Sequence, residues 1–396
     1  MATSMARPGR GTAPGAGRDR GAVRRGVVLL LALLLLGAFL AWADDSLNAY
    51  RIQIVTLVAI NAIIASSLAL TSGFTGVFSL GQIGFLAIGA YVGSLLTIAP
   101  RWKSERFLPG LPGWLASVDL SGWPDQWALL LACLAGGAVA ALVAAVVGAP
   151  LMRLSGHYVA VATMGFLIIV QSLAINLDGI TRGARGLSQI PHLTTPWSAY
   201  GWMVVTIYAV WRLRASAFGR AMIASRENLI AARAVGVDVL RTRLLAFVVG
   251  AFFTGVAGAL LGHQIGTVAP SAFYFATTFA IIIMVVLGGM GSITGAVVGA
   301  VIMTLAPEYL REVENGMSLG LLSFGPLFGL SQIILALGFI LVMVFRPQGL
   351  FGDRELGLGL LSRRGPGQGE TVALTEITPR VGEEAPLSED QIEQTR

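Results

Sequence analysis

Apolar stretches close to 20 residues long recur along the whole of this chain. The hydrocarbon core of a bilayer is about 30 Å thick, and a helix needs about 20 residues to cross it. Only 12% of the residues are charged, whereas soluble domains carry about a quarter. The 50 glycines, many of them inside the apolar stretches, favour close helix packing and broken helices. The sequence therefore predicts an all-α, polytopic transmembrane helical bundle.

We delimit about ten apolar runs and expect each to span the membrane. They cover residues 27–43, 52–71, 78–98, 127–149, 156–176, 197–213, 243–266, 272–290, 292–310 and 327–345. Ten spans place both chain ends on one side. Of the 27 basic residues, 20 fall on that side and 7 on the other, and basic residues accumulate on the cytoplasmic side of bacterial inner-membrane proteins. We therefore expect a multi-pass protein of the plasma (inner) membrane with both termini cytoplasmic.

The two ends of the chain differ in composition from the membrane region at 26–351. Residues 1–25 are rich in Arg, Gly and Ala, and residues 352–396 lose apolar periodicity, so we expect both to be disordered cytoplasmic tails. The first apolar run is short and precedes Asp44 and Asp45, a pattern that also describes a signal peptide. We expect a retained span, and cleavage would leave the topology of the rest unchanged.

The placement of charge narrows the class of protein. All 21 acidic residues lie outside the apolar runs or at their ends, whereas proton- and sodium-driven transporters usually hold ionisable side chains within the membrane. The sequence contains no G-x-x-x-x-G-K-[ST] phosphate loop, so any ATP must be hydrolysed by another chain. Cys133 and the three scattered histidines form no metal-binding pattern. We expect no metal or cofactor in this chain, contact with lipid rather than nucleic acid, and no enzymatic activity.

Two glycine-rich junctions interrupt the apolar runs, at 72–85 and 287–295. Irregular backbone is not tolerated in contact with lipid, so each break must be buried in protein, line a water-filled path or lie at the surface. Two interpretations stay open for both: a discontinuous element beside the solute path, or a tight turn with glycine-mediated packing. The candidate path residues are Gly73, Phe74, Thr75, Gly76, Ser79, Gly81, Gln82, Gly288, Gly289, Gly291 and Ser292.

The loop at 214–242 carries a third segment of interest on the expected cytoplasmic side. From Phe218 to Val235 it has no proline and one glycine, which predicts a short helix that Gly236 would end. Small side chains recur there at three- and four-residue steps, as they would on a face that meets another protein. The alternatives are a coupling helix that inserts into a partner and an amphipathic helix on the lipid headgroups.

Several of these segments resemble one family. The pattern S-G-F-T-G-x-F-S-L-G-Q-x-G-F-x-x-I-G-A-Y at 72–91 resembles the first signature of LivM-type permeases, although that family commonly has His at the position of Gln82. The loop motif E-A-A-x-x-x-G of ABC importers is matched at 230–236, with Ile230 in place of Glu. Further similar segments are Gly186-Leu187-Ser188, Gly288-Gly289-Met290-Gly291-Ser292 and Arg346-Pro347-Gln348-Gly349-Leu350.

The resemblance implies a permease subunit of an ABC importer for branched-chain amino acids. Such a subunit pairs with a LivH-like permease, two ATP-binding subunits that carry ATP-Mg, and an extracytoplasmic substrate-binding protein. Urea or short amides are alternative solutes, and a secondary transporter acting alone is the alternative mechanism. The resemblance assigns ATPase coupling to Gly219, Arg220, Arg226, Glu227, Ala231, Ala232 and Gly236.

Overall fold

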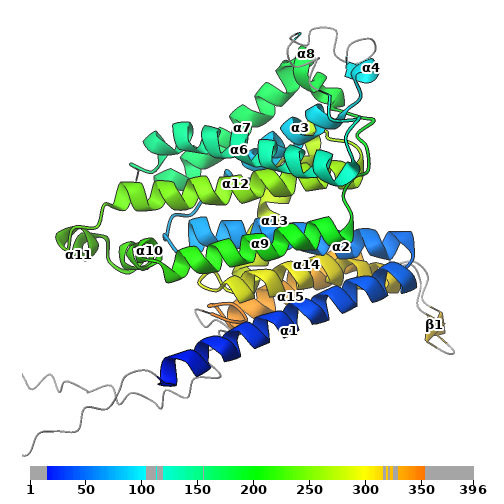
Figure 1. Ribbon diagram of the computed structural model, residues 1–396. Helices are drawn as coiled ribbons and strands as arrows, with labels where there is room; N and C mark the ends of the chain where they lie inside the picture. The colour runs from blue at the N-terminus through cyan, green and yellow to red at the C-terminus, as the bar shows by residue number, and fades with distance from the viewer. Residues whose placement is uncertain are drawn as a thin grey trace, which may run out of the picture. The chain divides into compact units, whose positions relative to one another are not determined.

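The computed structural model describes residues 16–103, 113, 119–154, 156–314, 318–319, 322–323 and 329–352 (Figure 1). Most of both predicted tails therefore lies outside the described residues. So does half of the loop between the third and fourth apolar runs. The statements below concern the described part of the chain.

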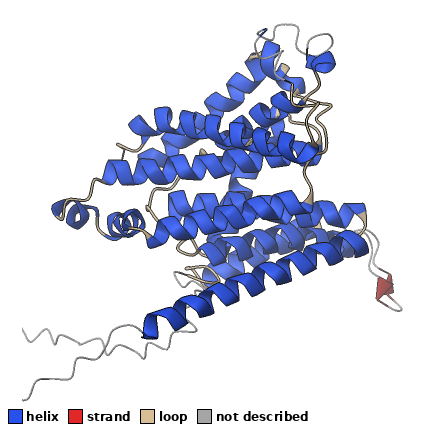
Figure 2. Cartoon of the chain, in the orientation of Figure 1, coloured by secondary structure: helices blue, strands red, loops and turns tan. Residues whose placement is uncertain are grey.

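Helices make up nearly all of this structure (Figure 2). The main ones are α1 (Ala16–Ser46), α2 (Ala49–Leu68), α3 (Gln82–Thr97), α6 (Asp125–Leu151), α7 (His157–Asn176), α9 (Pro196–Ala215), α12 (Val239–Ile265), α13 (Phe275–Gly288), α14 (Ile293–Glu314) and α15 (Leu330–Phe345). Short helices are α4 (Pro100–Trp102), α8 (Asp178–Thr181), η3 (Gly183–Arg185) and η4 (Pro270–Ala272). A two-residue hairpin pairs β1 (Ser318–Leu319) with β2 (Leu322–Ser323).

Each of the ten predicted apolar runs overlaps one of the main helices. Six segments of the described residues are long and apolar enough to cross a membrane: 49–73, 125–151, 157–176, 239–265, 270–288 and 293–311. Helices α3 and α15 are apolar but shorter than these. The structure is that of a multi-pass membrane protein, and the count of ten spans stays a prediction.

Helix α12 packs against α2, α3 and α6, and glycine allows the close approach. A Cβ atom added at Gly89 of α3 would lie 2.0 Å from the carbonyl oxygen of Gly255, and one added at Gly258 would lie 2.0 Å from that of Leu86. Small residues four positions apart, as at Gly258 and Gly262, let helix backbones touch in membranes. The frequent glycine therefore reflects helix packing as well as the breaks.

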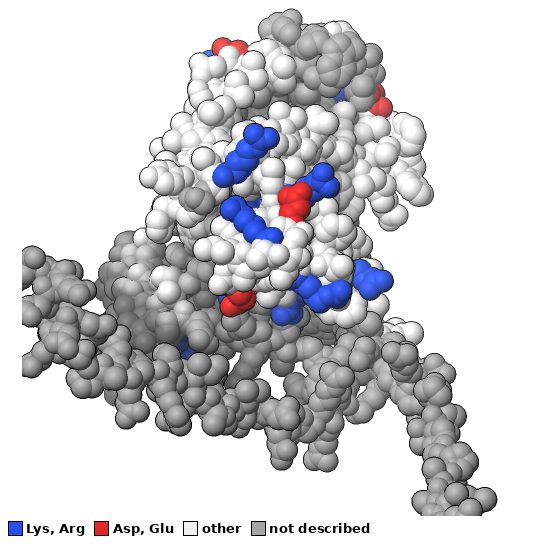
Figure 3. All heavy atoms as spheres, turned by 90° about the vertical axis from the view of Figure 1, so that its left-hand side faces the viewer, with Lys and Arg blue, Asp and Glu red and all other residues white. Residues whose placement is uncertain are grey.

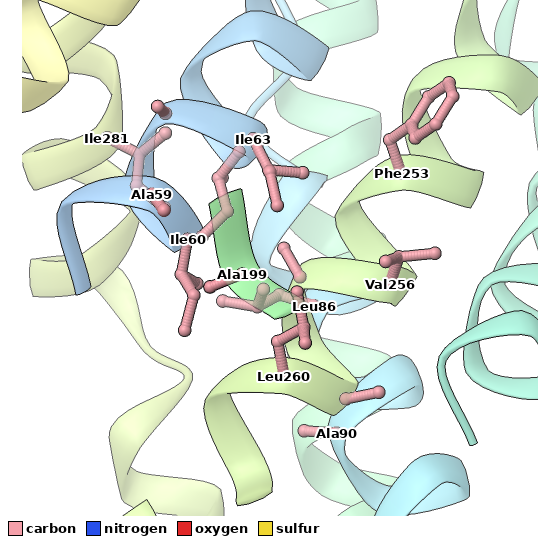
Figure 4. Packing of buried hydrophobic residues seen from close by; sticks show 14 of the residues in the cluster. Ala59, Ile60, Ile63, Leu86, Ala90, Ala199, Phe253, Val256, Leu260 and Ile281 are labelled. Carbon is pink, nitrogen blue, oxygen red and sulfur yellow. The ribbon is translucent and has the colours of Figure 1, made fainter. Parts of the chain in front are cut away.

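The largest cluster of buried apolar side chains lies where α2, α3, α9, α12 and α13 meet (Figure 4). Figure 4 labels Ala59, Ile60 and Ile63 of α2, Leu86 and Ala90 of α3, Ala199 of α9, Phe253, Val256 and Leu260 of α12, and Ile281 of α13. A second contact joins α2 to α14, where Asn61 Nδ2 donates a hydrogen bond of 2.9 Å to Thr304 Oγ1. These contacts hold the end of α2 beside α12 and α13.

The first helix begins earlier than predicted. Helix α1 starts at Ala16, so residues 16–25 are helical although we expected a disordered tail there. Alanine and arginine are good helix formers, and the apolar run that follows extends the same helix. Its C-terminal part is anchored by the buried Leu40 and Ala43, and by a 2.9 Å hydrogen bond from Trp197 Nε1 to Asp44 Oδ2.

The loop after α9 folds into two helices, where we predicted one. They are α10 (Ala217–Glu227) and α11 (Leu229–Ala234), and the break falls at Asn228, which has extended backbone. Its Oδ1 accepts hydrogen bonds of 3.0 Å from the N–H groups of Ile230 and Ala231. An asparagine that caps a helix in this way competes with continuation of the preceding helix.

These two helices project from the end of the bundle where α9 stops and α12 starts, at the left of Figure 1. Figure 3 faces this end and shows basic side chains spread over it. Its exposed arginines include Arg212, Arg220, Arg233 and Arg241. We call it the arginine-rich end.

At the opposite end of the bundle, Leu187 and Val268 form an isolated antiparallel β-bridge. The neighbouring Gly186 has a positive φ of 68°, and a Cβ there would lie 2.2 Å from the Val268 carbonyl oxygen. The Gly-Leu-Ser segment at 186–188 therefore has a structural reason for its glycine.

Candidate functional site

The first glycine-rich junction lies inside the bundle. Helix α2 continues as a π-helix, η1 (Ala69–Gly73), and α3 begins only at Gln82. Gln82 Nε2 donates a 3.3 Å hydrogen bond to the carbonyl oxygen of Gly250, eleven residues after the start of α12 at Val239. At 1.5 Å per residue that is roughly 16 Å along the helix, about half of a membrane span. The break therefore lies well along α12, and a place beside the solute path stays a prediction.

Side chains satisfy part of the broken backbone, as a low-dielectric setting requires. The Ser79 N–H donates to Ser72 Oγ at 3.2 Å, and the Leu80 N–H donates to Thr163 Oγ1 at 3.0 Å. Thr75 Oγ1 donates back to the Thr71 carbonyl within the helical part. The hydroxyls between the glycines therefore stabilise the break.

The second junction packs directly on the first. A Cβ atom added at Gly73 would lie 1.8 Å from the carbonyl oxygen of Met290, so the two backbones are in contact. Gly289 has a φ of 115°, which a residue with a side chain rarely adopts. The N–H groups of Leu350 and Phe351 donate to the carbonyls of Leu287 and Gly288 at 2.9 and 3.0 Å.

Helix α10 contacts the first junction from the arginine-rich end. Arg226 Nη1 donates a 3.0 Å hydrogen bond to the carbonyl oxygen of Gly73. A Cβ at Gly76, which has a φ of 70°, would lie 3.1 Å from Arg226 Cγ. The guanidinium of Arg214 lies 5.2 Å from the ring centre of Phe74, which is buried. Three segments far apart in sequence therefore meet at residues 73–76.

A narrow crevice opens between the two junctions and α13, too tight for a water molecule. Its lining is Leu68, Ser72, Phe78, Ser79, Ile282, Val285, Val286 and Met290. The hydroxyl of Ser79 is buried and finds no hydrogen-bond partner among the described residues. The crevice combines an apolar lining with one unsatisfied hydroxyl, but in this conformation it lacks the ~300–1,000 Å³ of a small-molecule site.

The predicted path residues thus fall into one buried site. Gly73, Phe74, Thr75, Ser79, Gly81 and Gln82 are buried in the first junction, and Gly288, Gly289, Gly291 and Ser292 are buried in the second. Gly76 is exposed beside Arg226. A Cβ at Gly81 would lie 2.7 Å from the Thr163 carbonyl oxygen, so Gly81 is required for packing.

The predicted coupling residues divide into exposed and buried ones. Arg220, Glu227, Ala231 and Gly236 are exposed, whereas Gly219 packs on the Arg214 backbone. Ala232 is only 3% exposed, because the short α11 turns that side toward its own chain, and its role in coupling stays a prediction. Gly236 has a φ of 84°, and the following N–H of Val237 bonds to the Ala232 carbonyl, which ends α11.

The exposed surface of α10 and α11 contains large apolar side chains. Phe218, Ile230 and Val235 are 56%, 82% and 79% exposed. Arg220, Ala231 and Arg233 are exposed with them. We call these six residues the exposed patch; apolar side chains rimmed by charge are typical of a surface that meets another protein.

A larger cavity, of about 520 Å³, lies at the opposite end. The ends of α3 and α12, the start of α6 and the segment 188–193 line it, with Arg101, Trp123, Asp125, Gln189 and His192 among the lining residues. Its volume is in the range of small-molecule sites. Within the described residues, no three His, Cys, Asp or Glu side chains lie together where they could hold a metal ion.

Two parts of the site were not predicted from the sequence. Arg214 was included only as the first residue of the loop at 214–242, and residues 346–350 were included only as a family-like ending. The positions of both depend on contacts between distant helices. For Arg214 the available signals were an aromatic residue in the first junction, Phe74, and an arginine-rich loop that could contact it.

Comparison with known proteins places this arrangement in a family. Residues 50–344 match the family described as branched-chain amino acid transport system / permease component. The high-affinity branched-chain amino acid transport system permease protein LivM of Escherichia coli is 30% identical over 357 residues, covering 82% of this chain and 74% of LivM. LivM of Salmonella typhimurium is 29% identical over 375 residues, covering 86% and 78%.

A second type of relative is LivH of Salmonella typhimurium, a permease protein of the same kind of system. It is 27% identical over 335 residues, covering 76% of this chain and 94% of LivH. No solved structure matches. The match covers the two junctions, α10, α11 and most of the helical bundle. This chain therefore belongs to the family of branched-chain amino acid transport permease components.

Proposed function

We propose that this chain is the membrane-spanning permease subunit of an importer for branched-chain amino acids, driven by ATP hydrolysis on separate subunits that dock on the exposed patch. One observation carries the proposal. The patch belongs to the same short helices that contact the buried junction through Arg226. A partner that moves α10 would therefore act directly on the broken helix.

An opening of the crevice would expose side chains that suit this class of solute. Five of its lining side chains are aliphatic or thioether groups, and two are serine hydroxyls. Leucine, isoleucine and valine combine an apolar side chain with polar ends, as do the solutes in the names of LivM and LivH. Since a water molecule does not fit, the path is closed here in this conformation.

The relatives support a second permease as one partner. LivM and LivH are both permeases of branched-chain amino acid systems, so a LivH-like second permease would complete the membrane part. ATP-Mg would bind to two ATP-binding subunits on the cytoplasmic side, where we place the arginine-rich end and both termini. The 520 Å³ cavity at the other end would receive solute from an extracytoplasmic binding protein.

The alternative for α10 and α11 is a resting place on lipid headgroups. Helices of that kind bury a continuous apolar face in the headgroup layer. Here α11 has only six residues, and Asn228 breaks the surface between the two helices. The side chains of Ile230 and Val235 are largely exposed. This suits insertion into a groove of a partner protein better than contact with a flat membrane surface.

A tryptophan at position 230 separates the two interpretations. Ile230→Trp keeps the site apolar and favours the headgroup layer, but the larger ring would not fit a groove shaped for isoleucine. In membranes that contain the chain with its partner subunits, we expect this variant to lose ATPase co-purification and ATP-dependent leucine uptake. Ile340→Trp, at a 56% exposed position of α15, is the matched control and should keep both.

Two results would contradict the proposal. Full uptake and ATPase binding by Ile230→Trp would favour the headgroup interpretation. Leucine uptake by this chain that survives removal of the ATPases and follows an ion gradient would indicate a secondary transporter. Competition by isoleucine and valine, but not by urea, would identify the solute.

A further inference from the structure

Arg226 occupies a special place among the arginines of the loop. Its side chain is 29% exposed, and its Nη1 reaches across to the Gly73 carbonyl at 3.0 Å. Arg220, six residues earlier in α10, is exposed and donates instead to the carbonyl of Ala215, the last residue of the preceding α9, at 3.3 Å. Arg226 therefore reaches a segment distant in the sequence, whereas Arg220 reaches only the adjacent helix end.

The acceptor lies at the end of a helix. Gly73 is the last residue of η1, and carbonyls at a helix C-terminus lack partners within the helix. A cationic donor there is favoured both by the hydrogen bond and by the helix dipole. Hydrogen bonds with one charged partner are roughly twice as strong as neutral ones.

On its other side, Gly73 has no freedom to move alone. The Met290 carbonyl occupies the position where a Cβ of residue 73 would be, at 1.8 Å. The backbone of α10 itself touches the junction, because a Cβ at Gly76 would lie 3.4 Å from Arg226 Cα. A displacement of α10 is therefore passed from Arg226 to Gly73 and on to the second junction.

We propose that Arg226 is a positioning residue that joins α10 to the first junction, so that the two move as one unit when the ATPases act on the patch. This inference rests on the proposed function. It assigns Arg226 to transmission within the permease, rather than to ATPase binding as its sequence motif implies. Loss of Arg226 should then leave the ATPases bound and active but reduce the transport that their hydrolysis drives.

The first experiment compares Arg226→Gln with Arg212→Gln in the assembled transporter in proteoliposomes. We expect Arg226→Gln to retain ATPase co-purification and hydrolysis near the wild-type rates, while uptake per ATP falls by about tenfold or more, a ratio worth ~1.4 kcal/mol. Arg226→Lys, which keeps the charge without the guanidinium fork, should fall between. Arg212→Gln, at an exposed position outside the exposed patch, should transport normally. Normal uptake per ATP in Arg226→Gln, or loss of its ATPases, overturns the inference.

The second experiment replaces the hydrogen bond by a covalent one. A Cβ at Gly76 would lie 3.4 Å from Arg226 Cβ, close to the ~3.5–4.5 Å of disulfides. The double variant Gly76→Cys, Arg226→Cys should cross-link under mild oxidation, and the one native cysteine, Cys133, is buried. We expect the reduced form to be uncoupled and the oxidised form to regain uptake.

Gly76→Cys alone is the control for backbone strain at its positive φ, and uptake by the double variant is compared with that of this control. Failure to cross-link, or a cross-linked form that hydrolyses ATP without restored uptake, contradicts joint movement. If the wild-type chain binds no ATPase at all, the proposed function fails instead, and the cross-link still reports the contact.

Discussion

Replacing Gly73 by alanine tests whether the two junctions are in contact. The added Cβ would lie 1.8 Å from the Met290 carbonyl oxygen. Since carbon and oxygen atoms rarely approach closer than ~3.3 Å, the two backbones would have to separate by about 1.5 Å. No rotation of a side chain relieves this overlap, because the obstructing atom belongs to the main chain.

The cost follows from the two interactions involved. Overpacking of a close-packed interior costs roughly 1–3 kcal/mol. If the displacement also breaks the bond from Arg226 to the Gly73 carbonyl, a further ~1.5–3 kcal/mol is lost, as for other hydrogen bonds to charged groups. Gly73→Ala should therefore unfold at a clearly lower temperature than the wild-type protein in detergent, and should transport poorly.

Gly165→Ala supplies the matched control. Gly165 lies within α7, and a Cβ added there would meet no atom within 4 Å. Alanine in place of glycine inside a helix gains up to ~1 kcal/mol, so this variant should unfold at the same or a higher temperature. If Gly73→Ala behaved like Gly165→Ala in thermal unfolding followed by tryptophan fluorescence, the junctions would not be in contact and the site would be wrong.

Two further predictions concern titratable groups, each measured by thermal unfolding across pH. Gln82→Glu should destabilise the protein at neutral pH, because it buries a carboxylate against the Gly250 carbonyl. The thermal stability of this variant should recover at acid pH, where the carboxylate is protonated. Gln82→His keeps a hydrogen-bond donor at this position and should be tolerated. Hydrogen bonds from Ser331 and Gly329 lower the pKa of Glu314 from 4.5. The stabilisation of the folded state by ionised Glu314 is therefore present above its unfolded-state pKa and is lost as the pH falls through its lower folded-state pKa. The variant Glu314→Gln should not show this loss of stability at acid pH.

The helices were predictable because their signals are local. An apolar run predicts a buried or lipid-facing helix, whatever that helix packs against. Even the short run at 197–213 lies within α9 (Pro196–Ala215). The glycine breaks were predictable for the same reason. Which of the two interpretations of the first break holds could not be decided locally, since it depends on α12, whose Gly250 contacts Gln82.

The contacts between segments lay beyond local reasoning. Gly73 signals that some backbone comes close, but nothing near it in the sequence names Met290 as the neighbour. Ala231 and Ala232 are chemically identical, yet one is exposed and the other buried, because that depends on how a six-residue helix docks on α12. Asn228 carried a usable signal: an asparagine within a helical stretch is a candidate cap for a new helix.

The route from the exposed patch to the buried crevice combines one side-chain contact with one contact between two backbones. Arg226 meets a carbonyl of the first junction, and that junction meets a carbonyl of the second. Side-chain contacts can absorb small movements by changing rotamers, whereas contacts between close-packed backbones transmit strain. Under the proposed function, this explains why glycine lies at each step. A side chain at Gly73 would separate the two junctions that must move together, even though Gly73 does not need to touch an ATPase.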